Sequence, residues 1–189
     1  MNLPTKITIS RIFAVPVIMV LFYLSFSFHY VIAAAVFALA ALTDMIDGKI
    51  ARKRNEVTSL GKLLDPIADK ILACSLLIML AANGDAMMYF NPPVGVIFAA
   101  IIVGREILIG AFRTIAARKG VILAADKLGK LKTIFLNISI PMMMLSELHV
   151  SVKIIGNAFF ALAFLFTVIS GVNYLVKNRA VLSEDRKDA

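Results

Sequence analysis

Hydrophobic residues in this chain form long uninterrupted runs that are separated by short polar connections. Runs close to 20 residues match the hydrocarbon thickness of a bilayer, about 30 Å, which a transmembrane α-helix must span. We therefore expect six transmembrane helices, at residues 8–28, 30–51, 61–82, 93–117, 132–148 and 154–176. The pattern predicts an all-α polytopic membrane protein.

Composition supports this fold class, because 60% of the 189 residues are hydrophobic and a soluble domain of this length could not bury so much apolar surface. Residues 1–176 are expected to form a single domain that begins with a short interfacial segment, because the first turns mix polar and apolar residues. The first hydrophobic run is too long, and too closely followed by a second, for a cleaved signal peptide. Residues 177–189 are expected to form a polar tail.

The distribution of lysine and arginine predicts the topology. Basic residues gather in the N-terminal segment, in the connections after the second and fourth helices, and in the tail, whereas the three opposite connections contain only Lys153. Because basic residues are retained on the cytoplasmic side, both termini are expected to be cytoplasmic. Topology and attraction to anionic lipid explain the net charge of +8. Binding to nucleic acid is not expected, because the sequence shows no exposed basic domain.

Four aspartates interrupt the second and third hydrophobic runs. Asp44 and Asp47 lie near the end of the second predicted helix, and Asp65 and Asp69 lie on the third. Residues three or four apart share a helical face, so each pair projects together. Carboxylates near lipid are costly, so a cluster of them usually has either a counter-ion or a functional role. If the two faces meet, their oxygens suit two hard divalent cations, Mg²⁺ or Mn²⁺.

Small residues and an arginine accompany the acids. Gly48, Ala51 and Gly61 would allow a bulky ligand to approach the helix backbone closely. Arg52 is placed to bind a phosphate group with its planar guanidinium. Pro66 would be tolerated if its helix begins only a few residues earlier, because first-turn N–H groups have no helical partner.

An alternative interpretation is that these acids only pair with nearby basic residues and stabilise helix ends. The candidate partners are Lys49, Arg52, Lys62 and Lys70. Salt bridges alone would not require the interleaving of acids and small residues on both helices. A cation carrier is a further alternative, but carriers place their sites near the midplane and often in paired repeats, and no repeat is visible.

The complete pattern, Asp44-x2-Asp47-Gly48-x2-Ala51-Arg52-x8-Gly61-x3-Asp65-x3-Asp69, resembles the signature of the CDP-alcohol phosphotransferase family. The resemblance implies an enzyme that transfers a substituted phosphate from a CDP-linked donor to an alcohol and releases CMP. It also implies a homodimer and two divalent cations, Mg²⁺ or Mn²⁺. The metal ligands that it implies are Asp44, Asp47, Asp65 and Asp69. The residues that it implies for the nucleotide pocket are Gly48, Ala51, Arg52 and Gly61, with a weaker indication for Thr58 or Ser59.

The chemistry of this reaction requires a base for the attacking hydroxyl group. Asp69 is the candidate, acting as base, metal ligand or both. His29 and His149 fall in predicted external connections, so neither is expected to serve. No serine or cysteine stands beside a histidine, and direct in-line attack assisted by metal is therefore the simplest mechanism.

Basic residues beyond the acid motif indicate the acceptor. Arg113, Lys130 and Lys132 are expected to flank one cytoplasmic cavity, and Arg105 lies far enough into its helix to need a partner such as Glu106. This stretch resembles bacterial family members that use sn-glycerol 3-phosphate, with CDP-diacylglycerol from the bilayer as donor. The resemblance implies a multi-pass protein of the bacterial cell membrane with a cytoplasmic active site. Inositol phosphate, phosphatidylglycerol and serine remain alternative acceptors.

Overall fold

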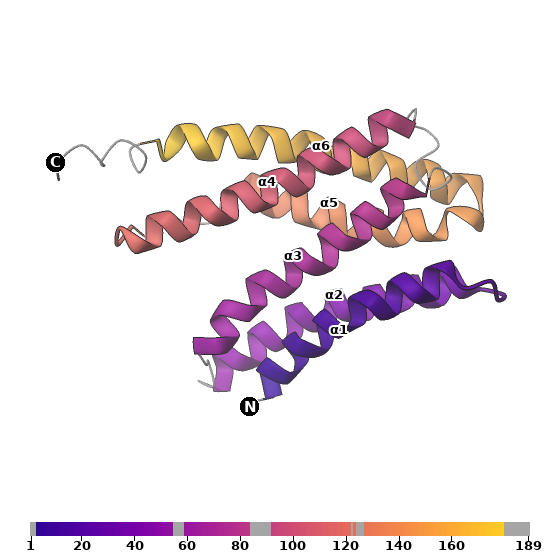
Figure 1. The fold of residues 1–189 in the computed structure, drawn as a ribbon, viewed down its shortest axis with the longest axis horizontal. Helices are drawn as coiled ribbons and strands as arrows, with labels where there is room; N and C mark the ends of the chain where they lie inside the picture. Colours follow the sequence, from indigo (N-terminus) through magenta and orange to yellow (C-terminus); the bar gives the residue numbers. More distant parts are fainter. Residues whose placement is uncertain (1–2, 55–58, 84–91, 122, 124–126, 180–189) are drawn as a thin grey trace.

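The structure is a computed structural model that describes residues 3–54, 59–83, 92–121, 123 and 127–179 (Figure 1). Within these ranges, only the backbone is described at residues 3–5, 44–54, 59–63, 92–93 and 127.

The described residues form six α-helices and one short 3₁₀-helix, with no strand among them, which confirms the all-α prediction. In chain order they are α1 (Leu3–Tyr23), α2 (His29–Arg54), α3 (Ser59–Ala82), α4 (Pro92–Arg118), α5 (Lys127–Met144), η1 (Leu145–Glu147) and α6 (Val150–Lys177). The largest differences from the predicted ranges are in α1, which lies five residues earlier at both ends, and in α5, which begins five residues earlier, at Lys127, in a basic stretch before its hydrophobic run. Hydrophobicity indicates the part of a helix that meets lipid, whereas the helix itself can continue into polar sequence.

The position of Pro66 differs from the expected one. Because α3 begins at Ser59, Pro66 lies inside the helix and beyond its first turn. The explanation that its missing N–H falls among unpaired first-turn groups is therefore wrong. Pro66 instead leaves one carbonyl of the preceding turn without its helical donor, just before Asp69.

Four of the described helices are long and apolar enough to cross a membrane: Lys6–Tyr23, Val94–Arg118, Leu128–Glu147 and Val150–Lys177. In α2 only the first part, His29–Thr43, is continuously apolar. In both α2 and α3, the charged residues of the aspartate motif interrupt the apolar run. Large apolar side chains such as Ile107 of α4 and Val176 of α6 are exposed on outer faces, as expected for surfaces that contact lipid.

The helices pack as two groups that meet where α3 contacts α4 and α5 and where α2 contacts α5 (Figure 1). Helix α1 packs against α2 and α3, α5 packs against α6, and α4 contacts α3 and α6. The main core contains fully buried side chains from most helices, including Ile18, Phe37, Leu76, Ile140 and Phe160. A smaller apolar cluster joins α4 to α6 through Ile109, Phe112, Ala116 and Tyr174. This packing brings polar faces of α3, α4, α5 and α6 around one cavity.

Candidate active site

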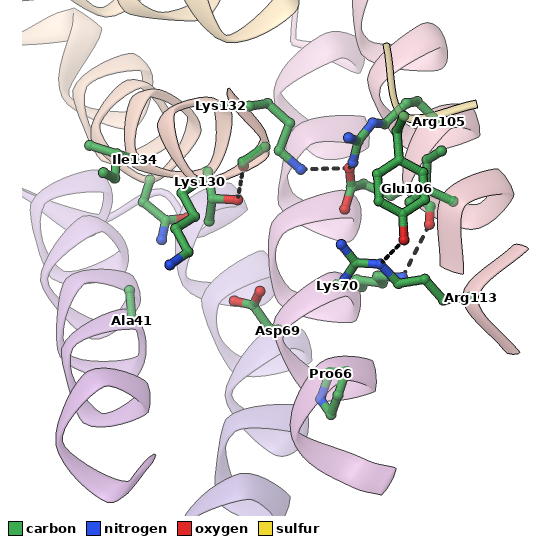
Figure 2. A pocket seen from close by; sticks show the side chains of 15 residues that line it. Ala41, Pro66, Asp69, Lys70, Arg105, Glu106, Arg113, Lys130, Lys132 and Ile134 are labelled. Carbon is green, nitrogen blue, oxygen red and sulfur yellow. Dashed lines mark hydrogen bonds and ion pairs between the residues drawn. The ribbon is translucent and has the colours of Figure 1, made fainter. Parts of the chain in front are cut away.

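A cavity of about 500 Å³ lies between α3, α4, α5 and α6, with one residue of α2 at its edge (Figure 2). Its charged lining combines two carboxylates with five basic side chains. These residues are Asp69, Lys70, Arg105, Glu106, Arg113, Lys130 and Lys132. The cavity therefore joins a carboxylate of the aspartate motif to the basic residues that the sequence indicated for an acceptor.

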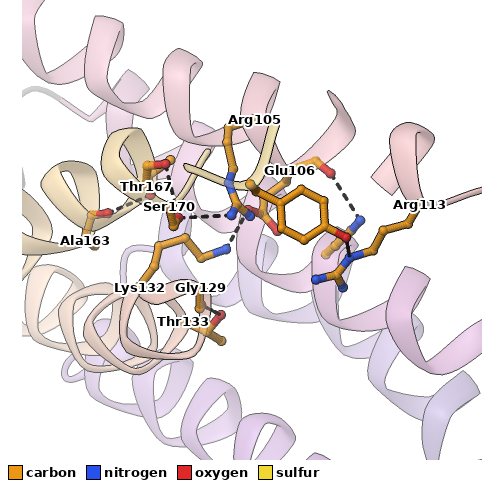
Figure 3. Close-up of polar contacts among 11 residues, drawn as sticks. Arg105, Glu106, Arg113, Gly129, Lys132, Thr133, Ala163, Thr167 and Ser170 are labelled. Carbon is orange, nitrogen blue, oxygen red and sulfur yellow. Dashed lines mark hydrogen bonds and ion pairs between the residues drawn. The ribbon is translucent and has the colours of Figure 1, made fainter. Parts of the chain in front are cut away.

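Glu106 is the centre of an ion-pair cluster that links α4 to α5 (Figure 3). Lys132 Nζ lies 2.5 Å from Glu106 Oε1, and Arg105 Nη1 lies 3.0 Å from the same oxygen. The Lys132 side chain is only 5% exposed. A buried ammonium group requires a compensating charge, and Glu106 provides it.

Arg105 is also anchored on α6. Its Nη2 donates to Ser170 Oγ at 3.0 Å, and Ser170 is fully buried. A Cβ at Gly171 would lie 3.3 Å from Arg105 Cγ, so the absence of a side chain there makes room for the arginine. The prediction that Arg105 needs a partner is confirmed, with Glu106 as one partner and Ser170 as a second.

Lys70 follows Asp69 on α3, but its ammonium group is directed to α4. Lys70 Nζ donates to the backbone carbonyl of Glu106 at 3.1 Å. Gly110 provides the space, since an added Cβ at this position would collide with Lys70 Nζ. This contact supports the packing of α3 against α4 and does not match the alternative in which Lys70 pairs with an aspartate.

Arg113 reaches the cavity from α4, one side of which is covered by α6. Its Nε donates to Tyr174 Oη at 3.0 Å, and its Cζ lies 5.2 Å from the centroid of the Tyr174 ring. Arg113 and Lys130 are both exposed, in contrast to Lys132 and Arg105. The predicted shared cavity for Arg113, Lys130 and Lys132 is confirmed, and their role in binding an acceptor stays a prediction.

The two aspartates of α3 have different surroundings. Asp69 is half-buried and lines the cavity, and as viewed in Figure 2 its carboxylate lies between Lys130 and Arg113. Asp65, one turn earlier, is not part of the cavity lining and accepts a hydrogen bond from Thr8 of α1. Helix α1 therefore supports one face of the aspartate motif.

The remaining residues of the motif are described only through the backbone or lie outside the description. Asp44, Asp47, Gly48, Ala51 and Arg52 fall in the last turns of α2, Gly61 falls in the first turn of α3, and Thr58 lies outside the described residues. No group of three metal-ligating side chains occurs among the side chains that the structure describes.

Helix bounds still place the aspartate pairs at matching depths. Asp47 and Asp65 each lie about 10 Å along their helix from the α2–α3 connection, at 1.5 Å per residue. Asp44 and Asp69 each lie about 15 Å from it. Carboxylate oxygens are the ligands that hard divalent cations prefer, so the chemistry of these four residues fits such cations.

The two histidines lie away from this cavity. His29 was predicted to lie in a connection, but α2 begins one residue earlier than predicted and His29 is its first residue. That prediction is therefore wrong. His149 caps α6, and its Nδ1 accepts the backbone N–H of Ser151 at 3.1 Å. Neither histidine lines the cavity, which agrees with the expectation that neither is the base.

The sequence did not indicate three residues that hydrogen-bond to predicted site residues, namely Thr8, Ser170 and Tyr174. Thr167, Ser170 and Tyr174 follow i, i+3, i+7 spacing on the otherwise apolar α6, and this polar stripe was the available signal. Thr8 carried no comparable signal, because its partner is 57 residues away.

Comparison with known proteins identifies the family of this chain. The family model for CDP-alcohol phosphatidyltransferase matches residues 1–169, and the chain belongs to that family. A curated relative from Rickettsia typhi, named CDP-diacylglycerol–glycerol-3-phosphate 3-phosphatidyltransferase, is 36% identical over 92% of this chain and 94% of its own. Relatives with the same name come from Bacillus subtilis, 34% identical over 94% and 95%, and Salmonella choleraesuis, 32% identical over 96% and 97%. The family expected from the aspartate motif is confirmed.

Proposed function

We propose that this chain transfers the phosphatidyl group of CDP-diacylglycerol to sn-glycerol 3-phosphate, forming phosphatidylglycerol phosphate and CMP. The observation that carries the proposal is that Asp69 shares one cavity with Arg113 and Lys130. A carboxylate that accepts a proton and cations that bind phosphate are the two parts that this reaction needs. The names of the relatives support the choice of donor and acceptor.

The charge of the cavity favours an acceptor that carries a phosphate group. Five basic side chains face two carboxylates, so the lining has excess positive charge. Arg105 and Lys132 are engaged by Glu106, and Arg105 also donates to Ser170, so these two basic residues contribute positive charge from the cavity wall. Arg113 and Lys130 are exposed and can contact the phosphate directly. Serine would leave this charge uncompensated.

In the proposed reaction, Asp69 accepts the proton of the attacking hydroxyl group of glycerol 3-phosphate. The hydroxyl oxygen forms a bond to the phosphorus that carries diacylglycerol. The bond from that phosphorus to the oxygen bridging the two phosphates breaks, and CMP leaves with the bond's electrons. Arg113 and Lys130 hold the acceptor phosphate beside Asp69, so that attack occurs within the cavity.

Two divalent cations, Mg²⁺ or Mn²⁺, are proposed as cofactors. Asp44, Asp47, Asp65 and Asp69 would hold them, which is supported by the matching depths of the two pairs along α2 and α3. When bound, the cations would neutralise the pyrophosphate and polarise the reacting phosphorus. The contact from Thr8 would fix the orientation of the Asp65 carboxylate for this purpose.

The nucleotide of the donor is proposed to lie against the ends of α2 and α3. Gly48, Ala51 and Gly61 would leave room at the helix backbones, Arg52 would bind the nucleotide phosphate, and Thr58 would add a hydroxyl. The diacylglycerol chains would extend between apolar helices into lipid.

The proposed setting is the bacterial cell membrane, with six spans, cytoplasmic termini and an active site at the cytoplasmic face. The four apolar helices and the basic connections support this topology. In α2 and α3, charged residues are expected near the cytoplasmic end, where the aspartates would meet substrates from water. Family membership supports a homodimer.

The experiment that tests the proposal is CMP release by the full-length protein in detergent with CDP-diacylglycerol. Glycerol 3-phosphate, inositol phosphate, serine and phosphatidylglycerol are supplied in turn, each with Mn²⁺, Mg²⁺ or a chelator. We expect CMP release with glycerol 3-phosphate and with none of the other three acceptors. This release should require Mn²⁺ or Mg²⁺ and should be absent with the chelator. Release with a different acceptor would refute the interpretation of the basic residues, and no release under any condition would refute the enzyme and reopen the cation carrier.

A further inference from the structure

Tyr174 is held rigidly at the wall of the cavity. It is 3% exposed, and its ring packs in the small cluster with Ile109, Phe112 and Ala116. The Phe112 and Tyr174 rings meet edge to face, with centroids 6.1 Å apart and planes at 77°. Because this packing fixes the ring, the hydroxyl group occupies a defined point on the cavity lining.

Arg113 is exposed and would otherwise sample many rotamers. Tyr174 restrains it twice, by the hydrogen bond from Arg113 Nε and by the cation–π contact in which Arg113 Cζ lies 5.2 Å from the ring centroid. The hydrogen bond uses Nε and leaves both terminal nitrogens for a ligand. Among the described residues, no carboxylate forms an ion pair with Arg113. A guanidinium presented in this way is suited to bidentate binding of phosphate.

We infer that Tyr174 is a positioning residue that holds Arg113 to receive the phosphate group of the acceptor. The inference rests on the proposed function and adds to it a residue that selects phosphorylated acceptors. Tyr174 lies beyond residues 1–169, the part that the family model matches. Lys130, on the opposite wall, brings a flexible point charge, whereas the Tyr174–Arg113 pair brings directional recognition.

The variant Tyr174→Phe tests this inference, because it keeps the ring and removes only the hydroxyl group. We expect KM for glycerol 3-phosphate to rise about fivefold, which corresponds to the loss of one hydrogen bond. KM for CDP-diacylglycerol and kcat should stay within about twofold of wild type, because Tyr174 touches neither the donor nor the reacting atoms in the proposed reaction. Tyr30→Phe, a partly buried tyrosine in the main core, is the matched control and should leave all three parameters unchanged.

A second variant examines the same contact from the other side. Arg113→Lys keeps the charge but lacks Nε, so Tyr174→Phe should have no further effect on KM for glycerol 3-phosphate in that background. If Tyr174→Phe folds poorly, this exposed substitution tests whether an oriented guanidinium is needed at all, and an unchanged KM for glycerol 3-phosphate in Arg113→Lys refutes the positioning role.

The outcomes separate the inference from the proposed function. If wild type releases CMP with glycerol 3-phosphate but Tyr174→Phe leaves its KM unchanged, or raises both KM values equally, the positioning role is refuted alone. A fivefold effect that persists in the Arg113→Lys background also refutes it. If wild type does not use glycerol 3-phosphate, the proposed function fails, and the inference fails with it.

Discussion

Replacing Glu106 by glutamine keeps the shape of the side chain but removes the negative charge that Lys132 and Arg105 share. Lys132 is 5% exposed and Arg105 is 14% exposed in their side chains, so water from the cavity replaces the lost carboxylate only in part. The variant therefore leaves two cations facing each other inside the helix bundle. We expect a large loss of stability from this single, nearly isosteric change.

The magnitude follows from the burial of the pair. Removing one partner of a buried ion pair typically costs about 3–5 kcal/mol. The glutamine carbonyl can still accept one hydrogen bond, so we expect the lower end, about 3 kcal/mol. For a chain of this length, that corresponds to a fall in Tm of about 6–12 °C.

A double variant distinguishes lost charge from lost packing. Lys132→Met added to Glu106→Gln removes the uncompensated ammonium and keeps an apolar stem of similar length. Because a buried ion pair can be replaced by apolar residues at little cost, the double variant should recover most of the stability lost in Glu106→Gln. Glu147→Gln, at an exposed glutamate in η1, is the matched control and should change Tm by no more than about 2 °C.

Thermal unfolding of the full-length protein in one detergent compares five forms: wild type, Glu106→Gln, Lys132→Met, the double variant and Glu147→Gln. If the Tm of Glu106→Gln equals that of wild type, the ion-pair cluster does not stabilise the bundle. If the effects of Glu106→Gln and Lys132→Met simply add, the two side chains are not coupled and the reasoning from their 2.5 Å contact is refuted.

Asp69→Asn should lower CMP release by a factor on the order of 100 to 10,000 while donor binding, measured at equilibrium, is retained; activity near wild type would exclude Asp69 as the base. Arg113→Ala should raise KM for glycerol 3-phosphate more than KM for CDP-diacylglycerol in steady-state kinetics, and equal increases would place Arg113 at the donor. Gly156→Ala should destabilise the protein by about 1–3 kcal/mol, because its Cβ would lie 3.1 Å from Met142 Cβ and 3.2 Å from nearby backbone. Gly104→Ala, with nothing within 4 Å, should be neutral or stabilising, and equal thermal unfolding of the two would contradict the α5–α6 packing.

The number of helices and their positions along the chain were largely predictable from the sequence, because long apolar runs separated by polar connections are typical of membrane-length helices. The convergence of Arg113, Lys130 and Lys132 on one cavity was also predictable, since the topology expected from the basic residues puts all three at the same aqueous face. The partnership of Arg105 and Glu106 followed from the cost of an unpaired arginine inside a helix bundle.

Contacts that depend on helix packing were not predictable. Lys132 of α5 donates to the Glu106 carboxylate, whereas Lys70 of α3 donates to the Glu106 backbone carbonyl. Which of these groups meet depends on the rotation of each helix about its axis. Sequence spacing defines faces within one helix but carries no information on which face of the next helix they meet. Tyr174 and Ser170 were missed for the same reason, although their shared stripe on α6 was visible.

The contact between Thr8 and Asp65 has a consequence for the order in which the protein is made. Helix α1 leaves the ribosome first, but its partner carboxylate belongs to α3 and is synthesised 57 residues later. Until then, α1 has only α2 to pack against, and buried polar residues such as Thr8 and Arg11 lack their final surroundings. Insertion of α3 therefore completes the N-terminal half of the bundle and fixes one aspartate of the motif in the same event. A ribosome stalled before α3 has emerged should hold an α1–α2 hairpin that remains sensitive to proteolysis or extraction.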